Sequence, residues 1–324
     1  MKSIESFTSL IVGDVHLADR PPTSRTDSYK EDVLNKLRWI VEYSNKRNPD
    51  VLLLLGDVFH IKRQDRNSHG LVQETASILG SSKSPVRIVI GNHDIREDSI
   101  DTVGEQPLGT LALHPNIDLL TGPDPDFPLY GIPYVDPTPE NIEYWLEKYR
   151  ADGGEDKYPF IATHQAIFPE KEMPIYPHVL AENWASEFRS KYTAYGHIHS
   201  RMRAGAWYTI EGTTFLNNGA ISRGSLHEET VKRKLAVTWF DGSKDEPFTS
   251  IDIPYRPFKE VFLWDDINRN KNTRDRVGAF LESLGSSSFD YLTAEGIIED
   301  ARTSDLPPSA VEELKDIVEE VITS

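Results

Sequence analysis

The sequence predicts a layered α/β fold, and two observations lead to that prediction. Over the first two-thirds of the 324-residue chain, short apolar runs rich in β-branched residues alternate with longer amphipathic stretches. This order is typical of parallel strands covered by helices. In addition, polar residues able to bind ligands directly follow several of the apolar runs, as expected where strands end at a common edge of a sheet.

The expected elements follow one another along the chain. The first strand is expected at 9–12, and the first helix at 29–46 has an apolar face made of Val33, Leu37, Ile40 and Val41. Further strands are expected at 51–55, 86–90, 159–163, 192–195, 207–210 and 235–240, and further helices at 71–79 and 138–150. Pro139 suits the first turn of the last of these helices.

The character of the sequence changes after the segment 253–257, which contains two prolines. We therefore expect a main domain at 1–255 and a small α+β capping domain at 256–324. Within the second domain, 268–284 is expected to be helical, and 309–322 is expected to form an acidic amphipathic helix.

Composition excludes several classes of protein. The chain has no cysteine, which excludes disulfides, thiolate catalysis and Cys-ligated zinc. No apolar run approaches the roughly 20 residues of a membrane span, and the N-terminus lacks the apolar region of a signal peptide, so we expect a cytoplasmic protein. The net charge of −17 disfavours diffuse attraction to nucleic acid, but it permits a local phosphate site at bound cations.

Five segments that follow predicted strands carry side chains able to bind metals. They are Gly13-Asp14-Val15-His16, Gly56-Asp57-Val58-Phe59-His60, Gly91-Asn92-His93-Asp94, Thr163-His164-Gln165 and Gly196-His197-Ile198-His199. Each alone has an ordinary explanation as a turn or a surface histidine, but the five together favour a metal site. Its carboxylate, amide and imidazole ligands suit manganese, iron or zinc better than calcium. We expect the glycines to let the backbone turn sharply ahead of the ligands.

The five segments resemble, in content and order, the signature motifs of the calcineurin-like metallophosphoesterases over roughly residues 8–240. That resemblance implies a four-layer αββα sandwich of two sheets flanked by helices, with two divalent metal ions at the sheet edge. Carried over by position, one ion is held by Asp14, His16, Asp57 and His199, and the other by the bridging Asp57 with Asn92, His164 and His197. Such ions, about 3.5–4 Å apart, activate water and polarise a phosphate. Mn²⁺ is preferred here, with Fe²⁺, Zn²⁺ or Mg²⁺ as alternatives.

The two residues that follow Asn92, His93 and Asp94, are expected to act in catalysis. His93 is expected to stabilise the transition state or to protonate the leaving oxygen. Asp94 is expected to orient His93 and raise its basicity, with a simple helix N-cap as the alternative.

Two segments are similar to those of the DNA repair nucleases of the Mre-eleven or SbcD type. The run from Gly56 to His60 resembles their second motif, which makes His60 a candidate phosphate contact, followed by the basic residue Arg63. The segment 215–224 resembles a later motif, although Asn218 stands where proline is usual, and it offers Arg223 as a further contact. Surface or structural roles are the alternatives for His60 and Arg223.

The region 256–324 lies where these nucleases carry a capping domain and a helix that binds a partner ATPase. The apolar stripe of 309–322 suits docking, or packing on its own domain. We therefore expect a manganese-dependent DNA exonuclease or endonuclease subunit that acts with an SbcC- or Rad-type coiled-coil ATPase, and homodimers are common in the family. The alternatives are a stand-alone phosphodiesterase or phosphatase acting on nucleotides or other small phosphoesters, and a protein-binding scaffold, which the intact ligand set disfavours.

Overall fold

The computed structural model describes residues 1–22, 25–60, 67–96, 99–169, 177–200, 206–224 and 233–263. The chain divides into two compact units, Met1–Val261 and Phe262–Ser324, and almost everything described here belongs to the first. Apart from residues 256–263, the expected capping domain lies outside the described residues, as do the helices expected at 268–284 and 309–322.

One six-stranded sheet contains the first three predicted strands. β1 lies in its interior, parallel to β2 and antiparallel to β13, and β2 continues the parallel run to β3 and β4. In spatial order its strands are β14 (Phe248–Asp252), β13 (Ala236–Asp241), β1 (Thr8–Val12), β2 (Val51–Leu54), β3 (Val86–Ile88) and β4 (Ile117–Leu119).

The second sheet also has six strands. Its centre is a parallel run of β12, β10, β7 and β6, with β11 and β5 added antiparallel at the two edges. In spatial order its strands are β11 (Trp207–Ile210), β12 (Thr213–Leu216), β10 (Tyr192–Tyr195), β7 (Phe160–Thr163), β6 (Leu129–Ile132) and β5 (Gly122–Pro123). A separate short pair joins β8 (Ile167–Phe168) to β9 (Val179–Leu180).

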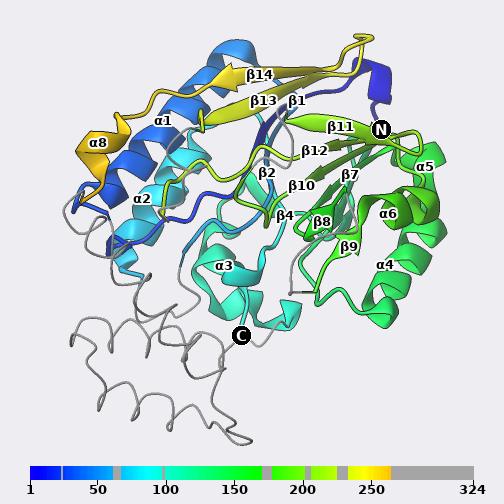
Figure 1. Cartoon of the computed structure of the whole chain (residues 1–324), viewed down its shortest axis with the longest axis horizontal. Coiled ribbons are helices and arrows are strands. Elements are labelled where there is room, and N and C mark those ends of the chain that lie inside the picture. The colour runs from blue at the N-terminus through cyan, green and yellow to red at the C-terminus, as the bar shows by residue number, and fades with distance from the viewer. Residues whose placement is uncertain are drawn as a thin grey trace, which may run out of the picture. The chain divides into compact units, whose positions relative to one another are not determined.

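Helices cover the outer faces of both sheets (Figure 1). On the first sheet lie α1 (Tyr29–Arg47), α2 (His69–Gly80) and α3 (Pro107–Leu111), and on the second lie α4 (Pro139–Asp152) and α6 (Ala181–Phe188), with the single turns α5 (Gly154–Lys157) and α8 (Phe258–Val261) elsewhere. Short 3₁₀ turns occur at η1 (Ile4–Ser6), η3 (Asn92–Asp94) and η4 (Ile100–Glu105).

The alternation of side chains along the strands separates three layers of core. In β2, Leu52 and Leu54 face the helices of the first sheet, whereas Leu53 points the other way and packs with Phe160 of the second sheet. Period-two alternation places successive strand residues on opposite faces. The two sheets therefore pack face to face and bury both faces of their central strands, which confirms the predicted α/β sandwich with helices outside both sheets.

The structure corrects several element boundaries and adds elements. The expected strand 86–90 ends at Ile88, and the expected helix 71–79 begins at His69, where Ser68 caps it by accepting a hydrogen bond from the Leu71 amide. β4, β5, β6, β8, β9, β12, β14, α3, α5, α6 and α8 were not predicted. No helix among the described residues has the length and apolar character of a membrane span.

Candidate metal centre

The five predicted segments follow β1, β2, β3, β7 and β10, at the carboxyl ends of parallel strands in the two sheets. Hydrogen bonds join these ends. The His197 amide donates to Asp14 Oδ1 at 3.2 Å, and His164 Nδ1 lies 2.6 Å from the Leu55 carbonyl oxygen. Segments that are up to 183 residues apart in sequence thus form one cluster.

The first predicted ligand set comes together closely. Asp14, His16, Asp57 and His199 each present one ligand atom, and these four atoms lie within 4.8 Å of one another. His16 Nε2 is 2.8 Å from His199 Nε2 and 3.7 Å from Asp57 Oδ2. Asp14 Oδ2 is 3.5 Å from His199 Nε2.

The second predicted set is brought together in two pairs. His164 Nε2 lies 3.3 Å from Asp57 Oδ2, and His197 Nδ1 lies 3.1 Å from Asn92 Oδ1. The rings of His164 and His197 are 5.4 Å apart between centroids and nearly perpendicular. Asp57 Oδ2 therefore lies between His16 of the first set and His164 of the second, which is the position that a bridging carboxylate needs.

His93 and His60 flank this cluster on the side of His16. His93 Nδ1 is 2.7 Å from the His60 carbonyl oxygen, which can only accept, so the proton lies on Nδ1 and Nε2 is left for the substrate. The His93 ring is 5.2 Å from that of His16 and stacks on His60 at 5.7 Å between centroids. The His60 amide donates to Leu17 O at 2.7 Å, so the backbone of His60 is held on both sides.

Asp94 is placed differently from the expectation that it orients His93. Its Oδ1 accepts from the Val58 amide at 3.1 Å, and its Oδ2 accepts from the Gly91 amide at 3.0 Å. Both carboxylate oxygens are thus used to join the turn after β3 to the turn after β2. The His60 carbonyl has the orienting role that we expected of Asp94, because it contacts the His93 ring directly.

The expected glycine turn is present at Gly56, whose φ is 103°, but several ligands also have left-handed backbones. His16, Asp57 and His197 themselves have left-handed φ values of 52°, 47° and 67°. Such conformations are costly for residues with a Cβ and cluster at functional sites. At position 196 a glycine is needed because the backbone passes close to two other segments. A Cβ there would lie 2.4 Å from Leu55 O and 2.6 Å from Asp14 Oδ1.

Burial and charge set the protonation of the cluster in the metal-free chain. Burial lowers the pKa of His197 to about 3, so its imidazole is neutral and able to bind a metal at neutral pH. For His164, burial acts to lower the pKa, but the Asp57 carboxylate outweighs it and raises the pKa to about 10. Burial also acts to raise the pKa of Asp57, yet His164 and His93 hold it well below its usual range. His164 and Asp57 therefore form an ion pair whose proton must leave when a cation binds.

These residues fit divalent metal ions. Asp14 Oδ2 is buried and has no hydrogen-bond partner among the described residues, as expected of an atom that coordinates a cation. Carboxylate, amide and imidazole donors without sulfur suit manganese, iron and zinc. When bound, divalent ions at such a site polarise a phosphoryl group and lower the pKa of water.

The remaining predicted residues lie elsewhere. Arg63 is outside the described residues. Arg223 lies in a different pocket, whose lining includes no residue of the predicted ligand set.

Sequence reasoning missed Tyr134, whose ring stacks on His197 with 5.5 Å between ring centroids and 20° between ring planes. It also missed Asn218, which donates to Ile11 O and accepts from Thr238 Oγ1, and so joins its loop to β1 and β13. The position of Tyr134 two residues after β6 was a usable signal.

The fold and this cluster define a class: a phosphoester hydrolase with ligands for divalent ions at the edge of a two-sheet sandwich. Comparison with known families agrees, since the profile of the calcineurin-like phosphoesterases matches residues 7–201. The chain belongs to this family, whose members are metal-dependent phosphoester hydrolases with two metal ions. No curated protein sequence matches the chain significantly.

Solved structures resemble the chain at low identity. The protein TT1561 of Thermus thermophilus is 12% identical with a TM-score of 0.50, covering 77% of this chain and 100% of that chain. A dimetal phosphatase from Danio rerio is 18% identical with a TM-score of 0.47 and covers 77% and 100%. A novel archaeal phosphodiesterase is 14% identical with a TM-score of 0.38 and covers 76% and 100%. The likeness to TT1561 concerns the fold alone.

Proposed function

We propose that the chain hydrolyses phosphodiester bonds in DNA, as a nuclease subunit of the SbcD type. The observation that carries this proposal is the position of His60. Its ring lies beside His16 and His93, and the ligand atoms of these three histidines are within 4.8 Å of one another. His60 lies outside the predicted ligand set, and because its Nδ1 lies 3.4 Å from His16 Nδ1, we assign the contact with a substrate phosphate to its Nε2.

The predicted ligands have the following roles in this proposal. Asp14, His16, Asp57 and His199 hold one divalent ion, and Asn92, His164 and His197 hold a second ion that shares Asp57. We propose Mn²⁺ as the native ion, in keeping with the oxygen and imidazole donors. As an imidazolium, protonated on both ring nitrogens, His93 donates the Nε2 proton to the leaving oxygen or stabilises charge there, while the His60 carbonyl accepts from Nδ1 and keeps the ring in place.

A small phosphodiester or nucleotide is the second candidate substrate, and the charge of the protein favours it. A net charge of −17 repels a polyanion more than it repels a small anion. Arg223, one of two arginines predicted to contact phosphate, lies in a pocket apart from the metal centre, and this removes one source of attraction to DNA.

The test is direct hydrolysis by the purified full chain. Linear duplex and single-stranded DNA, bis-p-nitrophenyl phosphate and cyclic nucleotides are each offered with Mn²⁺ and with Mg²⁺. The DNA proposal expects degradation of DNA that His60→Gln weakens through KM, while the rate on bis-p-nitrophenyl phosphate changes little. If the chain hydrolyses the small substrates but leaves DNA undegraded, even in the presence of a partner ATPase, a small phosphodiester or nucleotide is the better candidate substrate.

We further propose that the chain acts with an SbcC- or Rad-type coiled-coil ATPase and that 309–322 binds it. Leu314→Asp places a charge in the expected apolar stripe of that segment and should abolish co-purification with the ATPase, whereas Glu313→Gln should not. We also propose that the chain forms a homodimer, and sedimentation equilibrium of the purified chain measures its molecular mass in solution. Co-purification that survives Leu314→Asp argues against this docking site.

A further inference from the structure

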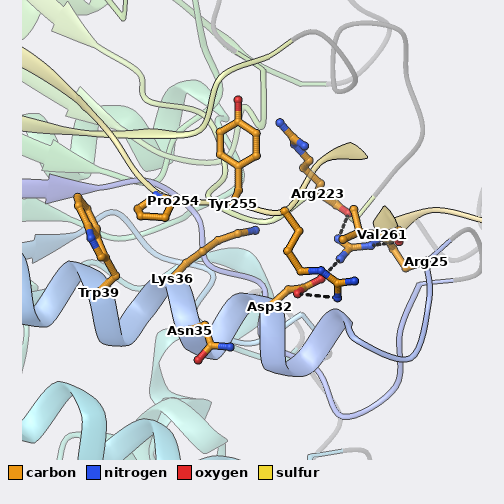
Figure 2. Close-up of a pocket in the computed structure, with 10 residues that line it drawn as sticks. Arg25, Asp32, Asn35, Lys36, Trp39, Arg223, Pro254, Tyr255 and Val261 are labelled. Carbon is orange, nitrogen blue, oxygen red and sulfur yellow. Dashed lines mark hydrogen bonds and ion pairs between the residues drawn. The ribbon is translucent and has the colours of Figure 1, made fainter. Parts of the chain in front are cut away.

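A second pocket, apart from the metal centre, lies between α1 and the segment 254–261 (Figure 2). We name it the Lys36 pocket. Its cavity has a volume of about 320 Å³, and its lining is Arg25, Asp32, Asn35, Lys36, Trp39, Arg223, Pro254, Tyr255, Arg256 and Val261. Four of these residues are basic and one is acidic, in a protein whose overall net charge is −17.

The charges in this pocket are unevenly compensated. Arg25 is paired with Asp32, at 2.9 Å between Nη2 and Oδ2, and it also donates from Nε to Val261 O at 2.8 Å. Lys36 and Arg223 have no carboxylate within 4.0 Å among the described residues, although they are only 5% and 3% exposed. A buried cation is costly unless an anion or several acceptors face it.

The acceptors that these two side chains do have are carbonyl oxygens. Lys36 Nζ donates to Ile221 O at 3.1 Å, and Arg223 Nη2 donates to Arg233 O at 2.9 Å. Arg223 Nε is buried, and no described residue accepts a hydrogen bond from it. Burial, together with the Arg25 and Arg223 guanidiniums, lowers the pKa of Lys36 to about 7. The pocket thus has unused donors and an excess of positive charge, and a bound anion would satisfy both.

The walls indicate what the anion is attached to. Trp39 and Tyr255 line the cavity, and Figure 2 shows Trp39 beside Pro254 at one end of the pocket and Tyr255 between Pro254 and Arg223. The Arg223 guanidinium lies over the Tyr255 ring at 4.2 Å. A volume of about 320 Å³ is at the lower end of small-molecule sites and is larger than a phosphate alone needs. Aromatic walls favour a flat ring in the remaining space.

The pocket is connected to the metal centre through one residue. The Ile221 amide donates to Asp14 O at 2.8 Å, and the Ile221 carbonyl accepts from Lys36. No residue of the predicted ligand set lines the pocket. A ligand of Lys36 and Arg223 therefore occupies a site of its own.

We propose that the Lys36 pocket binds a phosphate monoester joined to a flat ring, of the size of a nucleoside monophosphate. Lys36 and Arg223 contact the phosphate, and Trp39 and Tyr255 pack against the ring. The proposal does not depend on whether DNA is the substrate of the metal centre.

Calorimetric titration of the full chain with AMP tests this site. The titrations are made in an Asp57→Asn background, which disables the metal centre as a competing phosphate site. Adding Lys36→Met removes the charge and keeps the aliphatic stem. It should weaken AMP binding at least about tenfold, since a hydrogen bond to a charged group is lost. Lys46→Met is the matched control on the same helix, because Lys46 is exposed, and it should leave the affinity unchanged.

A second variant separates the phosphate from the ring. Trp39→Leu, at a pocket residue that Figure 2 shows apart from Arg223, should weaken AMP binding and leave the binding of inorganic phosphate unchanged. Adenosine should bind more weakly than AMP, because it lacks the phosphate. AMP binding that Lys36→Met leaves intact, equal affinities for AMP and adenosine, or no binding at millimolar AMP would each overturn the proposal.

Discussion

The metal centre and the Lys36 pocket contain buried polar groups that suit ligands of opposite charge. In the metal centre a buried acceptor, Asp14 Oδ2, has no hydrogen-bond partner among the described residues, and in the pocket the same is true of a buried donor, Arg223 Nε. The first arrangement calls for a cation and the second for an anion. The sign of the unsatisfied group therefore indicates the charge of the ligand, even where two sites are joined through a single residue, Ile221.

The two regions also differ in how their side chains are positioned. The ligands of the metal centre follow strand ends, and three of them have left-handed backbones. Lys36 lies in the regular helix α1, three residues after Val33 and four before Ile40, at a position of the apolar face. A metal site of this kind is recognisable as a motif, whereas α1 signals the pocket only by a lysine at a position where an apolar residue is expected.

The largest expected effect is that of Asp57→Asn. Asp57 faces both predicted ligand sets, so its loss should remove bound metal and lower phosphodiester hydrolysis by at least about a thousandfold, equivalent to several kcal/mol of transition-state stabilisation. Hydrolysis of bis-p-nitrophenyl phosphate and metal analysis of the purified protein measure both. Asp245→Asn, at an exposed turn, is the control. An Asp57→Asn protein that keeps its metal and its rate contradicts the bridging role.

The next effect is that of His93→Asn, which leaves the predicted ligand set intact. General acid catalysis contributes roughly 10²–10⁴-fold, so kcat should fall by that factor while metal content stays unchanged. Single-turnover rates with a substrate whose leaving group is a good nitrophenol and with one whose leaving group is a poor alcohol test the assignment. The loss should be larger for the poor leaving group, and equal losses would point to a role in charge stabilisation alone.

In the Lys36 pocket, replacing the charge should stabilise the protein. The pKa of Lys36 falls from its ordinary 10.5 to about 7 in the folded chain. Between these pH values the unfolded state binds one more proton, so wild-type stability rises with pH by up to about 1.4 kcal/mol per unit relative to Lys36→Met. The neighbouring guanidiniums of Arg25 and Arg223 stay charged throughout. Urea unfolding at pH 6 to 9 should show a larger free energy of unfolding for Lys36→Met than for wild type at pH 6, and this difference should shrink above pH 7. A difference that stays constant with pH would contradict the lowered pKa of Lys36.

The smallest expected effect is that of His60→Gln on small substrates. The His60 carbonyl, which holds His93, belongs to the backbone and survives the substitution. The ring contacts of His60 with His93 and His16 are lost, which is worth about 0.5–1.5 kcal/mol, so the rate on bis-p-nitrophenyl phosphate should fall by no more than about tenfold. Steady-state kinetics on that substrate measures the change. A loss as large as that of Asp57→Asn would place His60 among the metal ligands.

Much of the fold could be predicted because the central strands are buried on both faces. The continuous apolar run of β2, from Val51 to Leu54, is unambiguous, and α1 has a clear helical period. β6, which contains Gly131, and the two-residue strands β5, β8 and β9 are too short or too weakly patterned to be recognised. They form because neighbouring strands pair with them, which local sequence does not record.

The candidate site could be predicted in its residues and less well in its contacts. The ligand residues stand in recognisable motifs, and the structure brings Asp14, His16, Asp57 and His199 together as expected. The partners of Asp94 and His93 could not be predicted, because both involve backbone groups of another loop, Val58 and His60. Arg223 matched a motif by its sequence neighbours, yet its guanidinium lies over Tyr255, which belongs to a distant segment of the chain.

The left-handed backbones of His16, Asp57 and His197 indicate which positions would change first if the chain no longer had to catalyse a reaction. Each such conformation costs on the order of 1 kcal/mol or more in a residue with a Cβ, and glycine or asparagine adopts it more readily. A descendant released from catalysis gains stability by acquiring those residues at positions 16, 57 and 197. Inactive descendants should therefore lose these three side chains sooner than Asp14 or His164, whose backbones carry no such penalty.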